Sequence, residues 1–323
     1  MTAARGETAD RKLIDCLGSS AEVHGQVRGL LATTFELDPD FLEVDFLPAL
    51  LRLGAWEDRS WTSRVALEKE LAMMEAACIV MASGRYRGRP RSLRLEVLPL
   101  SGRKQHSKLT LVVYERAVRL LVTSANLTTQ GYRQNREVAL QLEAREDATQ
   151  DAALIVAALR DMPDNLVANL GQSGQLVRQL ALDVLSAWGP TQASPTQRFV
   201  WGGNEPPAWQ QVVEAWPAGE AIRRLAIVSP FWSDEGSSGP LWFFLEHLRS
   251  TGRLAEHAEV QLFTEGWRHP DGRWIPQLHQ TFCRFPTAEL GVSLTARAVS
   301  PRVLPEEVGG REDFVGARPL HAK

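Results

Sequence analysis

Short apolar runs closed by glycine, proline or charged residues dominate the first 150 residues and predict β-strands. Runs of this form are VRGLLATTFEL (27–37), ACIVMASG (77–84) and SLRLEVLPL (92–100). The runs KLTLVVYE and AVRLLVTSA are separated only by the turn-like Glu115-Arg116 and predict a hairpin. EVALQLEA (137–144) predicts one more strand.

Two other regions have helical patterns. Asp38-Pro39-Asp40 is turn chemistry that can open a helix, and an apolar stripe at helical spacing follows from Phe41 to Leu51. Residues 148–188 have no strand character and predict two or three helices, broken at Pro163 and near Gly171. The composition of GPTQASPTQ (189–197) predicts a linker.

After the linker the pattern starts again. Residues 223–252 have the order strand, loop, apolar helix, and further strands are predicted near 258–266 and 290–299. Thr33-Thr34-Phe35 corresponds to Ser229-Pro230-Phe231, and an aspartate follows each phenylalanine at the third position. Such landmarks indicate a divergent two-fold repeat.

The pattern therefore predicts an α/β protein with a two-fold pseudo-repeat, each half a mixed β-sheet flanked by helices. The predicted first half is 1–188 with a helical insert at about 148–188, 189–197 is the linker, and the second half is 198–323.

Composition narrows the class of protein. A hydrophobic fraction of 44 %, a charged fraction of 23 % and a net charge of -3 are typical of an ordinary globular protein. The N-terminus has no apolar run, and no stretch approaches the ~18 apolar residues that span a bilayer. Three dispersed cysteines without CxxC spacing indicate reduced thiols. We therefore expect a cytoplasmic location, no membrane partner, no metal and no other cofactor.

One segment departs from the even charge balance. Against the single acid Glu96, its basic residues are Arg85, Arg87, Arg89, Arg91, Arg94, Arg103, Lys104 and Lys108. It is either a solvated loop in an arginine-rich chain or a set of phosphate contacts for nucleic acid, DNA being the favoured partner.

The triplet His-x-Lys occurs twice, at His106 and Lys108 and again at His321 and Lys323. Chance would place it about 0.1 times in a chain of this composition. The two copies occupy corresponding places in the predicted halves. A lone histidine before a strand is more often structural, but the matched pair favours chemistry.

The residue types suit phosphate chemistry. Positions i and i+2 of a strand face the same side, so His106 and Lys108 are predicted to emerge together. An imidazole can attack phosphorus or transfer a proton, and an ammonium can bind the non-bridging oxygens. The amide of Asn126, at the end of the next predicted strand, can donate to the same oxygens.

These letters resemble the first motif of the phospholipase D superfamily, and most closely its tyrosyl-DNA phosphodiesterase branch. His106-x-Lys108, Asn126 and Glu137 match that motif, as does the block Ser124-Ala125-Asn126-Leu127 with Gly131 after it. Most members have an aspartate where this chain has Val113, whereas the tyrosyl-DNA phosphodiesterase variant lacks that aspartate.

The resemblance implies a covalent phosphohistidine intermediate with no metal. It makes His106 the nucleophile and His321 the general acid, with Lys108, Lys323 and Asn126 holding the phosphate. It implies that Glu137 orients His321, although a solvated acid at a strand end is the alternative. The residues expected to contact substrate are Ser124, Arg103 and Lys104.

The family continues beyond its second His-x-Lys with a strand, an asparagine and a glutamate. We therefore expect the second half to be incomplete, lacking on the order of a hundred residues, as the length of the first half indicates.

Three functions remain open. The first is a phosphodiesterase acting on nucleic acid, as a nuclease or in DNA repair by removal of 3′ adducts. The second is a phospholipase D or phosphatidyl transferase acting on lipid, and the third is an inactive nucleic-acid-binding module of a DNA-processing or defence assembly. Base stacking by tryptophan is a weaker prediction than core packing for Trp56, Trp61, Trp232 and Trp242.

Overall fold

The computed structural model describes residues 12–53, 61–82, 94–100, 106–135, 137–189, 199–202, 206–215, 219–228, 239–264, 266–276 and 285–298. The chain divides into two compact units, Met1–Trp201 (unit 1) and Gly202–Lys323 (unit 2), and each is described by itself.

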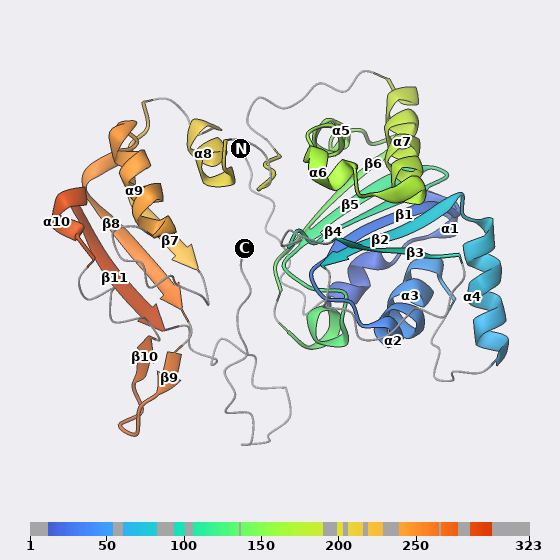
Figure 1. The fold of residues 1–323 in the computed structure, drawn as a ribbon, viewed down its shortest axis with the longest axis horizontal. Coiled ribbons are helices and arrows are strands. Elements are labelled where there is room, and N and C mark those ends of the chain that lie inside the picture. Colours follow the sequence, from blue (N-terminus) through green and yellow to red (C-terminus); the bar gives the residue numbers. More distant parts are fainter. Residues whose placement is uncertain are drawn as a thin grey trace. The chain divides into compact units, whose positions relative to one another are not determined.

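Unit 1 is built on a six-stranded mixed sheet (Figure 1). The strands are β1 (Val27–Thr34), β2 (Ala76–Ala82), β3 (Glu96–Leu100), β4 (Leu109–Tyr114), β5 (Ala117–Thr123) and β6 (Ala139–Arg145), in the order β3-β2-β1-β4-β5-β6. β1, β2 and β3 are parallel, whereas β4, β5 and β6 pair antiparallel to their neighbours. The predicted mixed sheet and the β4–β5 hairpin are confirmed.

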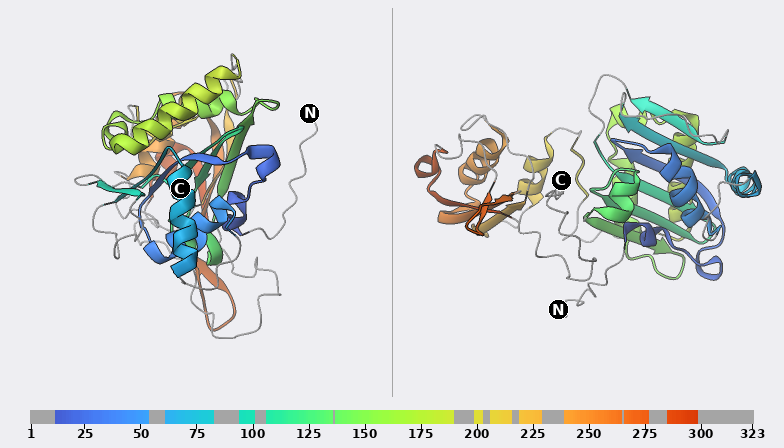
Figure 2. Two further views of the ribbon diagram at one scale, coloured as in Figure 1. Left: turned by 90° about the vertical axis from the view of Figure 1, so that its right-hand side faces the viewer. Right: turned by 90° about the horizontal axis from the view of Figure 1, so that it is seen from below.

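Helices cover both faces of this sheet (Figure 2). One face packs against η1 (Leu13–Leu17), α1 (Ala21–His24), α2 (Pro39–Phe41), η2 (Leu42–Phe46), α3 (Leu47–Leu51), α4 (Trp61–Met73) and η3 (Gln130–Gln134). The other packs against α5 (Ala152–Arg160), α6 (Asp164–Val167) and α7 (Gly171–Ala187).

Burial on both faces explains the continuous apolar runs of the sequence. Leu30 and Ala32 of β1 belong to one core and Leu31 to the other, and all three are fully buried. Because no position of such a strand faces water, alternation is lost from its sequence.

The predicted helix boundaries follow from local chemistry. Asp38 caps the first turn of α2, because its Oδ1 accepts the N–H groups of Asp40 and Phe41 at 3.0 and 3.3 Å. The breaks predicted at Pro163 and Gly171 separate α5, α6 and α7. The Ser173 N–H in the first turn of α7 donates to Glu96 Oε2 at 3.1 Å.

Unit 2 contains α8 (Ala208–Ala215), β7 (Ile222–Val228), α9 (Pro240–Ser250), β8 (Leu254–Thr264), β9 (Gly266–Arg268), β10 (Trp274–Pro276), α10 (Thr287–Leu290) and β11 (Val292–Ala298). Its three-stranded sheet has the order β11-β8-β7, and neighbouring strands are parallel. This is the order and direction of β3-β2-β1 in unit 1, as the predicted repeat requires. Trp201 still packs in unit 1, where its Nε1–H donates to Ala158 O at 2.9 Å.

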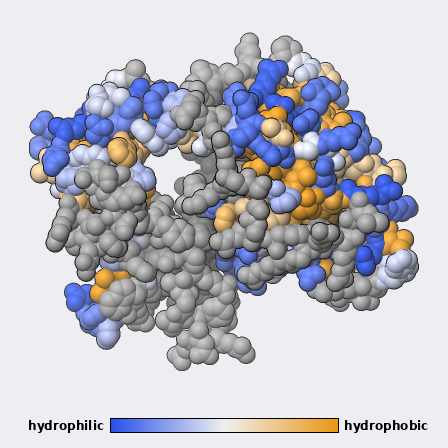
Figure 3. Space-filling view, in the orientation of Figure 1, coloured by the Kyte–Doolittle hydropathy of each residue, from blue (hydrophilic) through white to orange (hydrophobic). Residues whose placement is uncertain are grey.

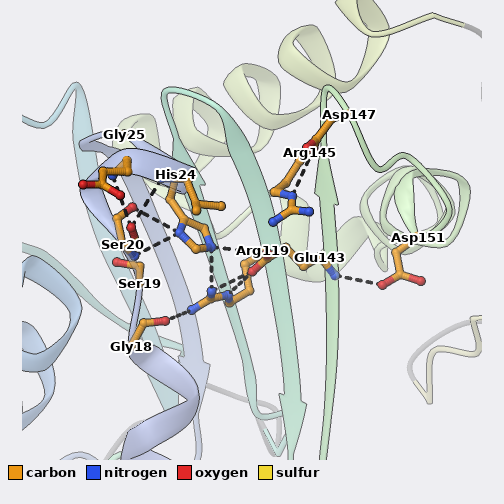
Figure 4. Close-up of polar contacts among 12 residues, drawn as sticks. Gly18, Ser19, Ser20, His24, Gly25, Arg119, Glu143, Arg145, Asp147 and Asp151 are labelled. Carbon is orange, nitrogen blue, oxygen red and sulfur yellow. Dashed lines mark hydrogen bonds and ion pairs between the residues drawn. The ribbon is translucent and has the colours of Figure 1, made fainter. Parts of the chain in front are cut away.

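A buried polar cluster, here the anchor cluster (His24, Arg119 and Glu143), fastens the N-terminal segment to β5 and β6 (Figure 4). Arg119 Nη1 donates to the carbonyls of Cys16 and Gly18 at 3.0 and 2.8 Å. Arg119 Nε donates to Glu143 Oε2 at 2.7 Å, and His24 Nε2 lies 3.2 Å from Glu143 Oε1.

Some large hydrophobic side chains of unit 1 remain exposed on its surface, where Figure 3 shows orange areas between polar ones. Trp61, Val138 and Leu140 are more than half exposed. The core packing favoured for the tryptophans is thus wrong for Trp61, while Trp242 packs against the core of unit 2. Trp56 and Trp232 lie outside the described residues. Among the helices described, none is long and apolar enough to cross a membrane.

Candidate active site

The end of β1 holds two other segments of unit 1 together. Thr33 Oγ1 accepts the Leu109 N–H at 3.1 Å and donates to Ser107 O at 3.0 Å. Thr34 Oγ1 accepts the Leu127 N–H at 3.0 Å and donates to Glu36 O at 2.7 Å. Both threonines are buried, so these hydroxyls fix the backbone beside His106 and beside Asn126.

His106 and Lys108 lie immediately before β4, so their predicted place on the strand itself is wrong. Their side chains nevertheless meet, with Lys108 Nζ 3.2 Å from His106 Nδ1 and 3.0 Å from His106 O. An ammonium can only donate, so Nδ1 is the acceptor and a neutral His106 ring carries its proton on Nε2.

Phe35, the residue after Thr34, packs against both members of this pair. Its ring centroid is 4.7 Å from that of His106, with an interplanar angle of 35°. Lys108 Nζ lies 5.9 Å from the Phe35 centroid, within the range of a cation–π contact. Phe35 therefore limits how the imidazole and the ammonium can move.

The Lys108 side chain is buried, with the residue only 6 % exposed. Burial lowers the pKa of Lys108 from 10.5 to about 8, and the negative charge of Glu137 opposes this shift. Burying a charged lysine costs free energy. Strongly shifted pKa values of this kind cluster at functional sites.

Glu137 is held by two donors from its own unit. The Ser124 hydroxyl makes a short hydrogen bond to Oε2, and Asn135 Nδ2 donates to Oε1 at 3.3 Å. Ser124 itself is buried, and its Oγ accepts the Val138 N–H at 3.0 Å. Ser124, which the sequence predicts as a substrate contact, is thus bound to Glu137.

Asn126 lies in the turn between β5 and η3. Its Oδ1 is buried and has no hydrogen-bond partner among the described residues. The turn is tight because a Cβ on Gly131 would lie 2.5 Å from Asn126 O and 3.1 Å from Asn126 N. Only glycine at position 131 allows this approach without displacing the backbone.

The His106–Lys108 pair and Glu137 are here called the site cluster, because Glu137 is held by Ser124, the residue after the Thr123 that pairs with Lys108. The backbone connects Asn126 to the same end of the sheet, since Thr123 N donates to Lys108 O at 3.0 Å. The predicted residues Arg103, Lys104, His321 and Lys323 lie outside the described residues. Within the described ranges, no group of three His, Cys, Asp or Glu side chains is placed to hold a metal ion.

Sequence reasoning did not assign a role in the site to Phe35, Thr33, Thr34 or Asn135. Phe35, Thr33 and Thr34 were identified only as a landmark of the repeat. Two adjacent hydroxyl residues at the end of a strand were the sequence feature that could have indicated their role in the site. Nothing in the local pattern pointed to Asn135, because its contact with Glu137 depends on how the chain turns after η3.

Comparison with solved structures finds yeast tyrosyl-DNA phosphodiesterase among the similar folds. One mutant form is 11 % identical with a TM-score of 0.42, covering 78 % of this chain and 60 % of that one. A further structure of the yeast enzyme is 12 % identical with a TM-score of 0.41, covering 77 % of this chain and 61 % of that one. The chain thus spans about three fifths of the length of these structures. No protein-family model matches the chain, and no curated protein matches it.

Proposed function

We propose that this protein is a metal-independent phosphodiesterase acting on nucleic acid, as a nuclease or a remover of 3′ adducts, through a phosphohistidine at His106. The observation that carries the proposal is the buried Lys108 ammonium within hydrogen-bond distance of the His106 ring. A phosphate group would supply the negative charge that this cation otherwise lacks apart from Glu137.

In the proposed first step, a phosphate oxygen takes over the donors of Lys108 and releases His106 Nδ1. The ring can then exchange tautomers, and one of its nitrogens attacks phosphorus. An N–P bond forms, the P–O bond to the leaving group breaks, and the leaving oxygen accepts a proton from a general acid. His321 is the proposed acid, by its place in the second His-x-Lys triplet.

In the second step, the neutral His321 takes a proton from water, whose oxygen attacks phosphorus. The N–P bond breaks, His106 regains its lone pair and the product leaves as a phosphate monoester. Lys108 stabilises the charge on the non-bridging oxygens in both steps. The Asn126 amide is proposed to help, because its buried Oδ1 has no partner among the described residues and its Nδ2 is a donor that phosphate oxygens can accept.

Nucleic acid is the proposed substrate class because the run from Arg85 to Lys108, rich in arginine, leads directly into the nucleophile. Such a run would bind the backbone phosphates on either side of the reacting one. The net charge of -3 means that this attraction is local to the run.

The test uses the protein and a 5′-labelled oligonucleotide ending in a 3′-phosphotyrosine, in buffer with EDTA. The wild type should release the tyrosine, and His106→Asn should abolish release. The matched control is His257→Asn, which changes an exposed histidine of unit 2 and should leave the rate unchanged. An acid quench removes phosphohistidine, so the covalent DNA–protein adduct should survive alkali and disappear in acid.

Full activity in His106→Asn, or a strict need for a divalent ion, would contradict the mechanism. Turnover of phosphatidylcholine vesicles without turnover of any oligonucleotide would contradict the substrate class. Salt-dependent DNA binding without turnover, unchanged in His106→Asn, would identify a binding module instead.

A further inference from the structure

Both carboxylate oxygens of Glu137 accept hydrogen bonds from residues of unit 1. The role that the sequence assigns to Glu137, orienting His321 of the other half, does not require these two bonds. Oε2 receives the Ser124 hydroxyl, and Oε1 receives the Asn135 amide at 3.3 Å. The two donors come from different segments, one after the end of β5 and one at the C-terminal end of η3.

The direction of each hydrogen bond is settled by chemistry. The Val138 N–H donates to Ser124 Oγ at 3.0 Å, so the hydroxyl proton remains for the carboxylate. The Ser124 N–H also donates to Val138 O at 3.0 Å, which fixes the serine on both sides. A carboxylate only accepts, so the amide nitrogen of Asn135 must be the atom that faces Oε1.

Asn135 is itself placed by the chain around it. Its backbone N–H donates to Gln130 O at 2.7 Å, which closes the π-helical turn of η3. π-Helical turns are uncommon and are frequent at functional sites. The extra residue of this turn determines where the Asn135 side chain starts, and the side chain then points back to Glu137.

We propose that Ser124 and Asn135 are positioning residues that hold the Glu137 carboxylate in place as the counter-charge of Lys108. This inference rests on the proposed function, since it assigns the two residues a task in the same phosphodiesterase site. In this proposal both residues act through Glu137, which their side chains contact.

Two donors, the Ser124 hydroxyl and Asn135 Nδ2, face the side chain of residue 137, so both of its terminal atoms must be hydrogen-bond acceptors. Glutamine there would turn an NH₂ group toward one of the two donors and would remove the charge beside Lys108. A glutamate held by two donors keeps its negative charge in one place, and this charge favours the charged form of Lys108. Tyr132 lies near enough for Glu137 to raise its pKa, although burial is the main cause of that rise.

The test follows the titration of Lys108 in protein labelled with ¹³C-lysine, and residues 1–323 contain five lysines to assign. The Lys108 signal is identified by its loss in Lys108→Arg. In the wild type it should titrate with a pKa of about 8. Ser124→Ala and Asn135→Ala should each lower this pKa, because the counter-charge is no longer fixed, and Ser124→Thr should restore it.

Ser124→Ala also removes the acceptor of the Val138 N–H, so a loss of stability in this variant would complicate the result. Asn135→Ala lies on a separate segment and tests the same role without removing that hydrogen bond. In an active enzyme, the alkaline limb of the kcat/KM profile should move to lower pH in both alanine variants. An unchanged Lys108 titration in both variants would overturn the positioning role. An inactive wild type with a shifted titration would overturn the proposed function and leave the positioning role standing.

Discussion

Two polar clusters of unit 1 are built from similar residue types, His24, Arg119 and Glu143 in the anchor cluster and His106, Lys108 and Glu137 in the site cluster. Each contains a histidine within hydrogen-bond distance of a cation. Arg119 is 4 % exposed and Lys108 is 6 % exposed. Residue type and burial therefore do not distinguish them.

The difference lies in the acceptors of the two buried cations. All three guanidinium nitrogens of Arg119 have acceptors, since Nη2 lies 2.6 Å from Glu143 Oε2 and 3.1 Å from His24 Nε2. The Lys108 ammonium instead has neutral acceptors, His106 Nδ1 at 3.2 Å and His106 O at 3.0 Å. Burial lowers the pKa of Lys108 to about 8.

A buried cation in a direct ion pair is already neutralised, whereas a buried cation with neutral acceptors can bind an anionic ligand. The anchor cluster is thus structural, and we expect variants in it to change stability. Variants in the site cluster should change turnover. Four substitutions or conditions test this contrast.

Lys108→Met should have the largest effect on turnover, a loss of about 10²–10³-fold in kcat/KM, as for one oxyanion donor. Its free energy of unfolding should not fall, because removing a buried cation also removes its desolvation cost. The measurements are steady-state kinetics and urea unfolding. Lys69→Met, an exposed change on α4, is the matched control. A Lys108→Met protein that unfolds easily would assign Lys108 a structural role.

Arg119→Met should have the largest effect on stability, lowering the free energy of unfolding by about 3–5 kcal/mol. It removes the hydrogen bonds of Arg119 to the Glu143 carboxylate and to the carbonyls of Cys16 and Gly18. The control Arg116→Met removes one exposed hydrogen bond to Ala21 O and should cost less than about 1 kcal/mol. Activity per folded molecule should be unchanged in both, and a selective loss of kcat in Arg119→Met would contradict the division of roles.

Gly131→Ala should lower both quantities moderately, because its Cβ would lie 2.5 Å from Asn126 O. We expect a cost of about 1–3 kcal/mol in unfolding free energy, together with reduced turnover as Asn126 is displaced. Gly202→Ala is the control, since the nearest atom to its Cβ would be 4.0 Å away. Equal behaviour of the two variants would show that the turn tolerates a side chain.

The last test is a pH dependence of stability. The folded pKa of Lys108, about 8, lies below its usual 10.5, so between these values the unfolded chain binds the extra proton. The contribution of Lys108 to the free energy of unfolding therefore rises as the pH rises from about 8 to 10.5. Burial raises the pKa of Cys78 and Tyr114, which acts in the opposite direction at high pH.

Because of those opposing groups, this measurement compares urea unfolding of the wild type with that of Lys108→Met across the same pH range. The wild type should gain stability relative to the variant as the pH rises. A constant difference would show that the Lys108 pKa is unperturbed.

The sequence was most informative where local chemistry decides the structure. The apolar runs placed the strands of unit 1, Asp38 placed the start of a helix, and Pro163 and Gly171 placed the breaks between three helices. The repeat was visible because it preserves the order of strand, loop and helix, which local patterns encode. These features depend on residues that are close in the sequence, so local sequence patterns are sufficient to predict them.

The His-x-Lys triplet, Asn126 and Glu137 could also be singled out from the sequence, because their spacing is unusual for residues of those types. The sequence could not distinguish Ser124 as a partner of Glu137 from Ser124 as a substrate contact. That depended on the return of the chain through η3, which places Asn135 and Val138 beside the end of β5.

The anchor cluster and the site cluster could be distinguished only from the tertiary structure. His24 and Arg119 are 95 positions apart, and Arg119 and Glu143 meet across paired strands β5 and β6. Phe35 reaches His106 because β1 pairs with β4, again far apart in the chain. By itself the sequence determined the elements and the reactive residue types. Pairing of distant strands decided which polar atoms meet, because hydrogen bonds form between spatial neighbours.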